Sequence, residues 1–169
     1  MNYFELYQLP IAPAVNFTMA KQKFYELSRK YHPDFFINAN EEVKADMLEQ
    51  SSLINKAFKT FSNKDETIKY FLLLKGYLQE EEKYQLAPTF LMEIMELNEQ
   101  LMEAKMENDE VKITNIKSQI LQLQSSIYEP IQSILENYQA DNSTEKELLQ
   151  IKEYYYQKKY LNRILESIH

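Results

Sequence analysis

The sequence of 169 residues contains a single glycine, Gly76, and this scarcity restricts the folds that it can adopt. Tight turns and phosphate-cradling loops use glycine because its backbone reaches conformations that other residues avoid. The dinucleotide-binding and P-loop folds need several such positions and are therefore excluded. A chain with so few turn-forming residues is predicted to consist of long helices joined by short connections.

The composition excludes further classes of site. Hydrophobic residues make up 44% of the chain, which suffices for one globular domain or two small ones. There is no cysteine, which rules out disulfides, thiolate-ligated zinc or iron–sulfur sites and cysteine nucleophiles. We therefore expect no resident metal and no cofactor.

The charge balance bears on partners and location. A net charge of −7 argues against nonspecific binding to nucleic acid, whose phosphates would repel such a surface. The longest apolar run, Tyr70 to Leu74, is far too short to span a membrane. The amino-terminal residues match neither a signal sequence nor a transit peptide, so a bacterial cytoplasm is the expected compartment.

The first half predicts a short helix followed by two antiparallel helices. Two prolines require an extended connector after Tyr3–Leu9. A long helix then begins near Asn16 or Thr18 and stops at His32. Asn38, with an acid three residues later, resembles the capping box of the second long helix, and Asn63 repeats this pattern before a short helix.

The second half predicts a three-helix bundle. Three long amphipathic stretches, separated by short connections, indicate antiparallel neighbours. Pro130 lies within the second stretch and should kink or split it, and Asn142 is the expected cap of the third. The predicted helices cover residues 88–107, 109–139 and 143–168.

A His-Pro-Asp tripeptide, His32, Pro33 and Asp34, stands between the two antiparallel helices of the first half. Taken alone it could be an ordinary helix stop with a solvated histidine. The helix before it carries four cations, which would steer the loop toward an acidic partner. These cations are Lys21, Lys23, Arg29 and Lys30.

The order of these pieces resembles the J domain of DnaJ-type co-chaperones. Tyr3-Phe4-Glu5-Leu6 opens the first helix, and Ile54-Asn55-Lys56-Ala57-Phe58 lies on the third. The resemblance implies that His32, Pro33 and Asp34 stimulate ATP hydrolysis by a DnaK/HscA-type chaperone, and that the four cations dock on its acidic surface. Phe35 stands where the family often has a lysine, so steering should be slightly weaker.

The helix from Pro88 carries more apolar surface than a bundle needs. Phe90, Ile94, Leu97 and Leu101 form a stripe that should face the bundle. Leu91, Met95 and Met102 form a second stripe about 100° away, bordered by Met92 and glutamates. The second stripe could widen the core or face a partner.

A J domain followed by an acidic bundle that begins Phe-Leu-Met-Glu resembles the HscB family of iron–sulfur cluster assembly co-chaperones. This implies a J domain over 1–76, a linker over 77–87 and a bundle over 88–169 that binds an IscU-type scaffold protein. The implied scaffold-binding residues are Leu91, Met92, Met95, Glu96, Glu99, Glu103 and one aromatic of the last helix. Tyr154, Tyr155 and Tyr156 compete for that role; Tyr155 is the prediction, and a core position is its alternative.

Three other functions compete with this two-site, non-enzymatic adaptor. A general DnaJ-type folding co-chaperone would keep the J domain, but the Gly-Phe-rich linker and cysteine-rich repeats of that class are absent from this sequence. An enzyme using His32 and Asp34 as an acid–base pair lacks an accompanying nucleophile or metal constellation. A helical adaptor with an accidental tripeptide leaves the ordered J-domain features unexplained.

Overall fold

The computed structural model describes residues 1–168, and His169, at the end of the expected bundle, lies outside the described residues. Over residues 1–168 the regular structure is entirely helical, which confirms the predicted all-α class. The chain divides into two compact units, Met1–Lys75 and Gly76–His169.

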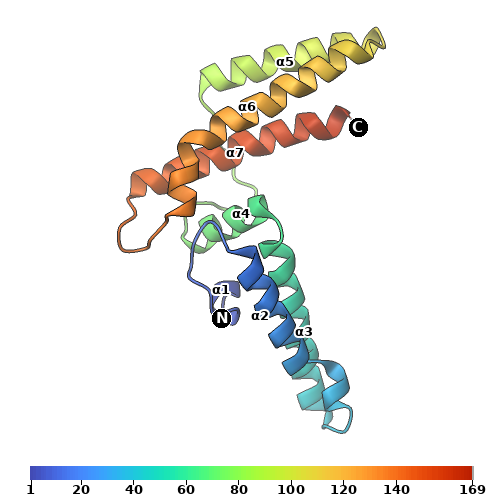
Figure 1. Cartoon of the computed structure of the whole chain (residues 1–169), viewed down its shortest axis with the longest axis vertical. Coiled ribbons are helices and arrows are strands. Elements are labelled where there is room, and N and C mark those ends of the chain that lie inside the picture. The colour runs from blue at the N-terminus through green and yellow to red at the C-terminus, as the bar shows by residue number, and fades with distance from the viewer. Residues whose placement is uncertain (169) are drawn as a thin grey trace. The chain divides into compact units, whose positions relative to one another are not determined.

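The first unit is built around an antiparallel pair of long helices, α2 and α3, which lie side by side (Figure 1). A short 3-10 helix, η1, occupies the connection between them. Its elements are α1 (Tyr3–Leu6), α2 (Phe17–Lys30), η1 (Pro33–Phe36), α3 (Glu41–Phe61) and α4 (Lys64–Leu74).

Asparagine side chains start these helices by accepting hydrogen bonds from otherwise unpaired backbone N–H groups. The Asn16 side chain accepts from the N–H of Met19 at 3.1 Å, and α2 begins at Phe17, between the two starting points that the sequence offered. Asn63 caps α4 in the same way. The predicted cap at Asn38 is wrong: Asn40 accepts from Val43 at 2.9 Å, because η1 takes up the residues after His32 and delays α3.

The core of the first unit is aromatic. Phe4 of α1 and Tyr7, which directly follows α1, are fully buried, and both rings pack against Phe61 at the end of α3. The Tyr7 hydroxyl donates to the Ile54 carbonyl oxygen at 2.7 Å, which fixes α1 on α3. Between the two long helices, the rings of Phe24 and Phe58 stack 4.2 Å apart.

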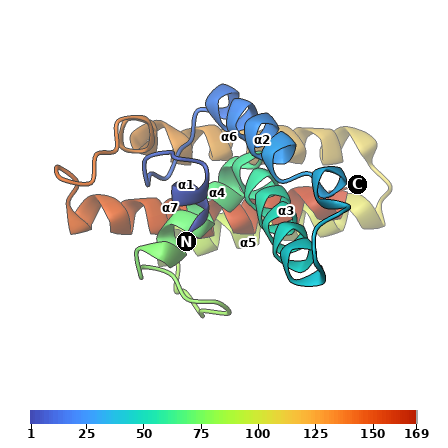
Figure 2. The ribbon, with the colours of Figure 1, turned by 90° about the horizontal axis from the view of Figure 1, so that it is seen from below.

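The second unit is an antiparallel three-helix bundle whose members run alongside one another in both ribbon views (Figures 1 and 2). The Lys105 ammonium donates to the Ser167 carbonyl oxygen at 2.6 Å, so the carboxyl ends of the first and third helices lie together. These helices are α5 (Pro88–Met106), α6 (Glu110–Glu136) and α7 (Glu145–Ile168).

Two predictions were made for the bundle, a kink or break at Pro130 and a cap at Asn142. Pro130 lies inside α6 without splitting it. The ribbon of α6 instead bends toward its carboxyl end (Figure 1), as expected where proline removes a helical hydrogen bond. The predicted cap at Asn142 is wrong, because the Thr144 hydroxyl accepts from the N–H of Glu147 at 3.2 Å.

The segment 77–87, predicted as a linker, belongs to the second unit and packs on α7. Gly76 precedes it with φ +79°, the left-handed conformation expected of a helix-terminating glycine. Leu78 and Leu86 are buried near the two ends of the segment. The charged residues between them are therefore held on the bundle.

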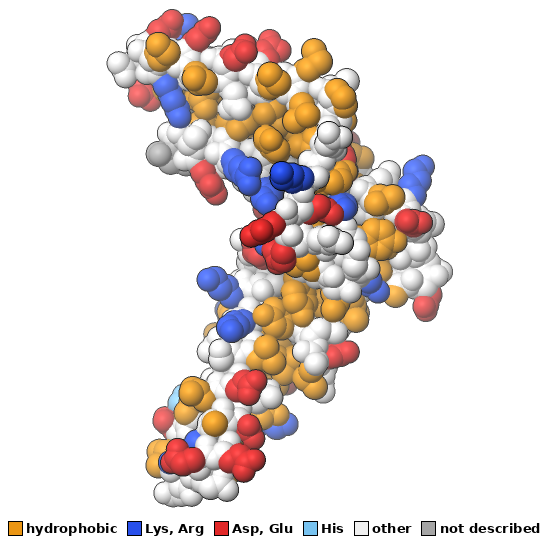
Figure 3. Space-filling view, turned by 180° about the vertical axis from the view of Figure 1, so that it is seen from behind, with side chains coloured by type: hydrophobic (Ala, Val, Ile, Leu, Met, Phe, Trp, Pro, Cys, Tyr) orange, Lys and Arg blue, Asp and Glu red, His pale blue; other side chains and the backbone are white. Residues whose placement is uncertain are grey.

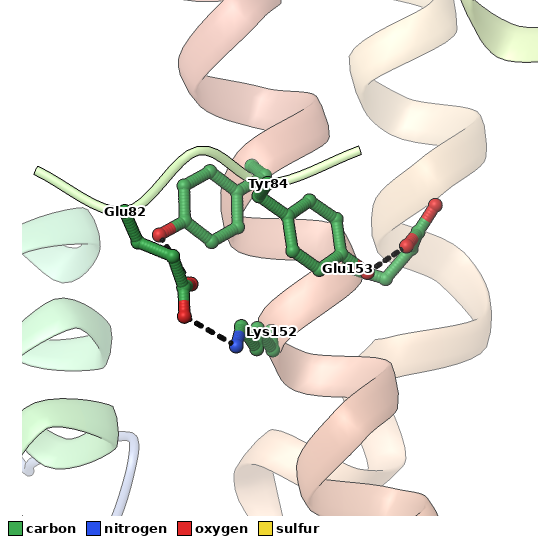
Figure 4. Close-up of polar contacts among 5 residues, drawn as sticks. Glu82, Tyr84, Lys152 and Glu153 are labelled. Atoms are coloured by element: carbon green, nitrogen blue, oxygen red, sulfur yellow. Dashed lines mark hydrogen bonds and ion pairs between the residues drawn. The ribbon is translucent and has the colours of Figure 1, made fainter. Parts of the chain in front are cut away.

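Glu82 and Tyr84 fasten this segment to α7 (Figure 4). The Glu82 carboxylate pairs with Lys152 at 3.0 Å and accepts the Tyr156 hydroxyl at 2.9 Å. The Tyr84 hydroxyl donates to Glu153, and the Tyr84 ring stacks on Tyr156 with centroids 4.5 Å apart. Burial, reinforced by the neighbouring carboxylates, raises the pKa of both tyrosines, so both hydroxyls remain donors. We call these five residues the Glu82 clamp.

Candidate functional site

The His-Pro-Asp loop lies at the open end of the α2–α3 hairpin. His32 has extended backbone angles (φ −64°, ψ 131°), and Pro33 begins η1 directly after it. Proline is favourable at the start of a helical turn because its φ is already fixed and no N–H is lost. The tripeptide therefore follows the end of α2 and begins the connection that leads through η1 to α3.

His32 and Asp34 are held together and open to solvent. The N–H of Asp34 donates to Nδ1 of His32 at 3.2 Å, and a carboxylate oxygen of Asp34 lies 3.5 Å from the same nitrogen. Both contacts use Nδ1, so Nε2 is the ring nitrogen left outside them. The two side chains are 53% and 80% exposed, so the loop presents an imidazole and a carboxylate to solvent.

Apolar side chains surround this pair, a feature that the sequence analysis did not identify. Phe35, Ile37 and Leu48 are 73%, 64% and 64% exposed. Beside them runs a shallow groove lined by Pro33, Asp34, Phe36, Ile37, Lys44, Met47 and Leu48. The signal was available in the sequence, because Phe35 and Phe36 follow the aspartate directly.

The four predicted cations lie on α2 ahead of the loop, but they do not form one stripe. Lys21, Arg29 and Lys30 are exposed. Lys23 is half-buried, donates to the Gln8 amide oxygen at 3.0 Å and pairs with Glu26 at 3.5 Å. At about 100° per residue, Lys23 and Lys30 lie on one flank of α2 and Lys21 on the other. Positive charge therefore spreads around the solvent side of the helix.

The second candidate surface lies on α5. Phe90, Ile94, Leu97 and Leu101 are buried, as the first stripe predicted. Met92 and Met95 are 70% and 61% exposed, and Leu91 is half-buried. The space-filling view shows hydrophobic side chains next to carboxylates at the surface of the bundle (Figure 3).

The three glutamates named with this surface are also exposed. At about 100° per residue, Glu96, Glu99 and Glu103 follow the same line of α5 as Met92. Glu96 also lines a polar groove between α5 and α6, together with Gln100 and residues of α6. Seven residues were predicted for this surface, and six of them lie on α5. These six form a continuous face of mixed apolar and acidic side chains, which we call the α5 face: Leu91, Met92, Met95, Glu96, Glu99 and Glu103.

The aromatic residue predicted for this surface on α7 does not face solvent. Tyr155 is 9% exposed, and its neighbours Tyr154 and Tyr156 are 4% and 8% exposed. Such burial fits the alternative of a core tyrosine. Tyr160, one helical turn further on, is 40% exposed, with the Arg163 guanidinium 5.9 Å from its ring centroid.

Residues 1–168 hold neither a metal-ligand cluster nor a membrane-spanning helix. Within that range, no group of three or more histidine, aspartate or glutamate side chains is arranged to hold a metal ion. None of the helices there is both long enough and apolar enough to cross a membrane.

The sequence is similar to a described protein family and to named relatives. Residues 86–169 match the family model described as the HSCB C-terminal oligomerisation domain. The chain is 41% identical over 109 residues to the co-chaperone protein HscB of Buchnera aphidicola, covering 64% of this chain and 63% of that relative. It is 38% identical over 110 residues to the HscB homolog of Shewanella halifaxensis, with the same coverage.

Solved structures extend the likeness to both units. The chaperone HscB from Vibrio cholerae superposes with a TM-score of 0.74 at 25% identity, covering 99% of this chain and 95% of that one. The human co-chaperone protein HscB gives a TM-score of 0.80 at 28% identity, covering 99% of this chain and 80% of that one. The chain belongs to the HscB family.

Membership of the HscB family locates the two candidate surfaces within a shared fold. The α5 face lies inside the region matched by the HscB family model, and the superpositions cover 99% of the chain, so they extend to the unit that carries the His-Pro-Asp loop. The alignments with the curated relatives span about 63% of the length of those relatives, all of which are named co-chaperones.

Proposed function

We propose that this protein is a J-domain co-chaperone that stimulates the ATPase of a DnaK/HscA-type chaperone and delivers an IscU-type iron–sulfur scaffold protein to it in a bacterial cytoplasm. The observation that carries the proposal is the exposed His32–Asp34 pair at the end of the α2–α3 hairpin. No catalytic group is needed in this chain, because hydrolysis takes place in the chaperone.

The loop can act on a partner because its polar groups are held in place before binding. The Asp34 N–H holds the His32 ring through Nδ1, which leaves Nε2 available to a polar group on the chaperone. Pro33 limits the backbone freedom that would otherwise be lost on binding. The loop therefore offers an imidazole and a carboxylate that are already close together.

The cations of α2 would steer an acidic chaperone surface toward the loop. The whole chain carries a net charge of −7, which works against an acidic partner. The exposed Lys21, Arg29 and Lys30 place local positive charge on α2. An acidic chaperone surface would approach along α2 and meet the His-Pro-Asp loop at its end.

The α5 face is the proposed scaffold site. Two exposed methionines give an adaptable apolar contact, and a line of glutamates beside them selects a basic surface on the scaffold. On α7, exposure favours Tyr160 over the predicted Tyr155 as the aromatic contributor. One chain that holds both partners raises the effective concentration of scaffold at the chaperone.

An ATPase assay with a purified DnaK/HscA-type chaperone tests the proposal. His32→Gln should abolish stimulation while scaffold affinity, measured by calorimetry, is retained. Asn38→Gln, an exposed change in the same loop, is the matched control and should stimulate like the wild type. Full stimulation by His32→Gln would refute the role of the loop. Capture of heterogeneous unfolded proteins in preference to the scaffold would instead favour a general folding co-chaperone.

A further inference from the structure

Four of the seven methionines of the chain lie on α5. Met92, Met95, Met102 and Met106 are 70%, 61%, 64% and 82% exposed. We propose that the first three are a site of reversible oxidation by peroxide, and that their oxidation switches off scaffold binding by the α5 face. The proposal rests on the scaffold-binding function proposed above.

The positions of these methionines make the α5 face sensitive to their oxidation state. At about 100° per residue, Met95 and Met102 lie on the same line of α5 as Leu91, and Met92 begins the line of glutamates. Met92 and Met95 belong to the α5 face and Met102 extends its apolar line, so three exposed thioethers supply most of the apolar surface there. Because their side chains already stand in water, an oxidant reaches them without unfolding the helix.

The chemistry requires only a peroxide. A sulfur lone pair of the thioether attacks one oxygen of hydrogen peroxide, the O–O bond breaks, and an S–O bond forms. The transferred oxygen gives its proton to the departing hydroxide, which leaves as water, so the sulfur is oxidised by two electrons to the sulfoxide and the peroxide is reduced. This sequence contains no cysteine thiol to compete for the oxidant, and methionine sulfoxide reductases reverse the step.

The consequence for binding follows from the change in polarity. A sulfoxide replaces an apolar, adaptable side chain by a polar one that must be desolvated when a partner covers it. Residues at the centre of an interface contribute most of its affinity. Oxidation of Met92, Met95 and Met102 should therefore weaken scaffold binding by about tenfold or more.

The test combines two measurements on the full chain treated with hydrogen peroxide. Peptide mass spectrometry should show Met92, Met95 and Met102 oxidised faster than the half-buried Met47. Calorimetry with a purified IscU-type scaffold should show the loss of affinity, and treatment with both methionine sulfoxide reductases should restore it. Circular dichroism before and after treatment checks that the helices are retained.

The variant Met92→Leu/Met95→Leu/Met102→Leu keeps apolar side chains of similar volume. It should lose no affinity on peroxide treatment relative to its own untreated value. The matched control Met19→Leu, at a 48% exposed position on α2, should lose affinity as the wild type does. The proposal is overturned if oxidised wild type keeps its affinity, or if the triple variant loses as much. Absence of scaffold binding before treatment would refute the proposed function instead.

Discussion

Replacing Lys152 by methionine should release the segment 77–87 from α7. The Lys152 ammonium is the charged partner of Glu82 in the Glu82 clamp, at 3.0 Å, and the two side chains are 14% and 22% exposed. Methionine preserves most of the apolar length of the lysine side chain but removes the charge. Glu82 would then remain largely enclosed, with the Tyr156 hydroxyl as its remaining partner in the clamp.

The magnitude follows from the separation and the exposure. Two unit charges 3.0 Å apart attract by about 5 kcal/mol at an effective dielectric constant of about 20, and desolvation offsets much of this. Removing one member of a fully buried pair costs about 3–5 kcal/mol. Because both side chains retain some contact with water, we expect the opening free energy of the segment to fall by about 2 kcal/mol. That change makes opening about 30-fold more frequent.

Trypsin provides the assay, because Lys83 lies between Glu82 and Tyr84, the two residues of the segment 77–87 that belong to the Glu82 clamp. Cleavage after Lys83 should depend on how often the segment opens, and mass spectrometry should show it about 30-fold faster in Lys152→Met. Lys146→Met, an exposed position in the first turn of α7, is the matched control and should leave the rate unchanged. Equal cleavage of wild type and Lys152→Met would refute the reasoning.

Three further predictions concern single positions. Burial raises the pKa of Tyr7 above its ordinary value of 10.0, so the folded state holds its proton longer than the unfolded state, and stability should fall as the pH rises above about 10. Tyr7→Phe should flatten that fall in melting temperature measured between about pH 9 and 11, and an equally steep fall would contradict it. Gly76→Ala should lower the free energy of unfolding in urea by about 1 kcal/mol, because φ is +79°. No atom lies within 4 Å of the added carbon, so backbone strain is the whole cost, and an unchanged free energy would show that the turn relaxes. Phe35→Lys should lower the half-maximal concentration for ATPase stimulation at low salt and make it more salt-dependent, and an unchanged salt dependence would exclude steering by this position.

The helical architecture could be predicted because its determinants are local. Asn63 is the cap that the sequence indicates, α2 begins next to the predicted start at Asn16, and the buried stripe of α5 follows directly from residue spacing. Asn38 and Asn142 failed as caps for a common reason. A better-placed capping residue, Asn40 or Thr144, stood two positions later, and spacing alone cannot choose between neighbouring caps.

The site could be predicted where it follows one helix and not where it depends on contacts between distant segments. The exposed residues of α5 have the spacing that the sequence shows. The three consecutive tyrosines of α7 point in directions about 100° apart, and their burial depends on packing from other segments. Tyr84, for example, covers Tyr156 from a segment that the sequence marked as a charged linker. No periodicity in α7 could reveal that contact.

Complementation in trans tests the central claim, that one chain joins the two partners. His32→Gln lacks the proposed chaperone contact, and Leu91→Ala/Met92→Ala/Met95→Ala lacks the proposed scaffold contact. Each variant is added alone, and then both together, to the chaperone with scaffold present, and ATP hydrolysis is measured. The account predicts that the mixture fails to reach the stimulation given by the wild type. Wild-type stimulation by the mixture would show that the two surfaces need not share a chain and would contradict the account.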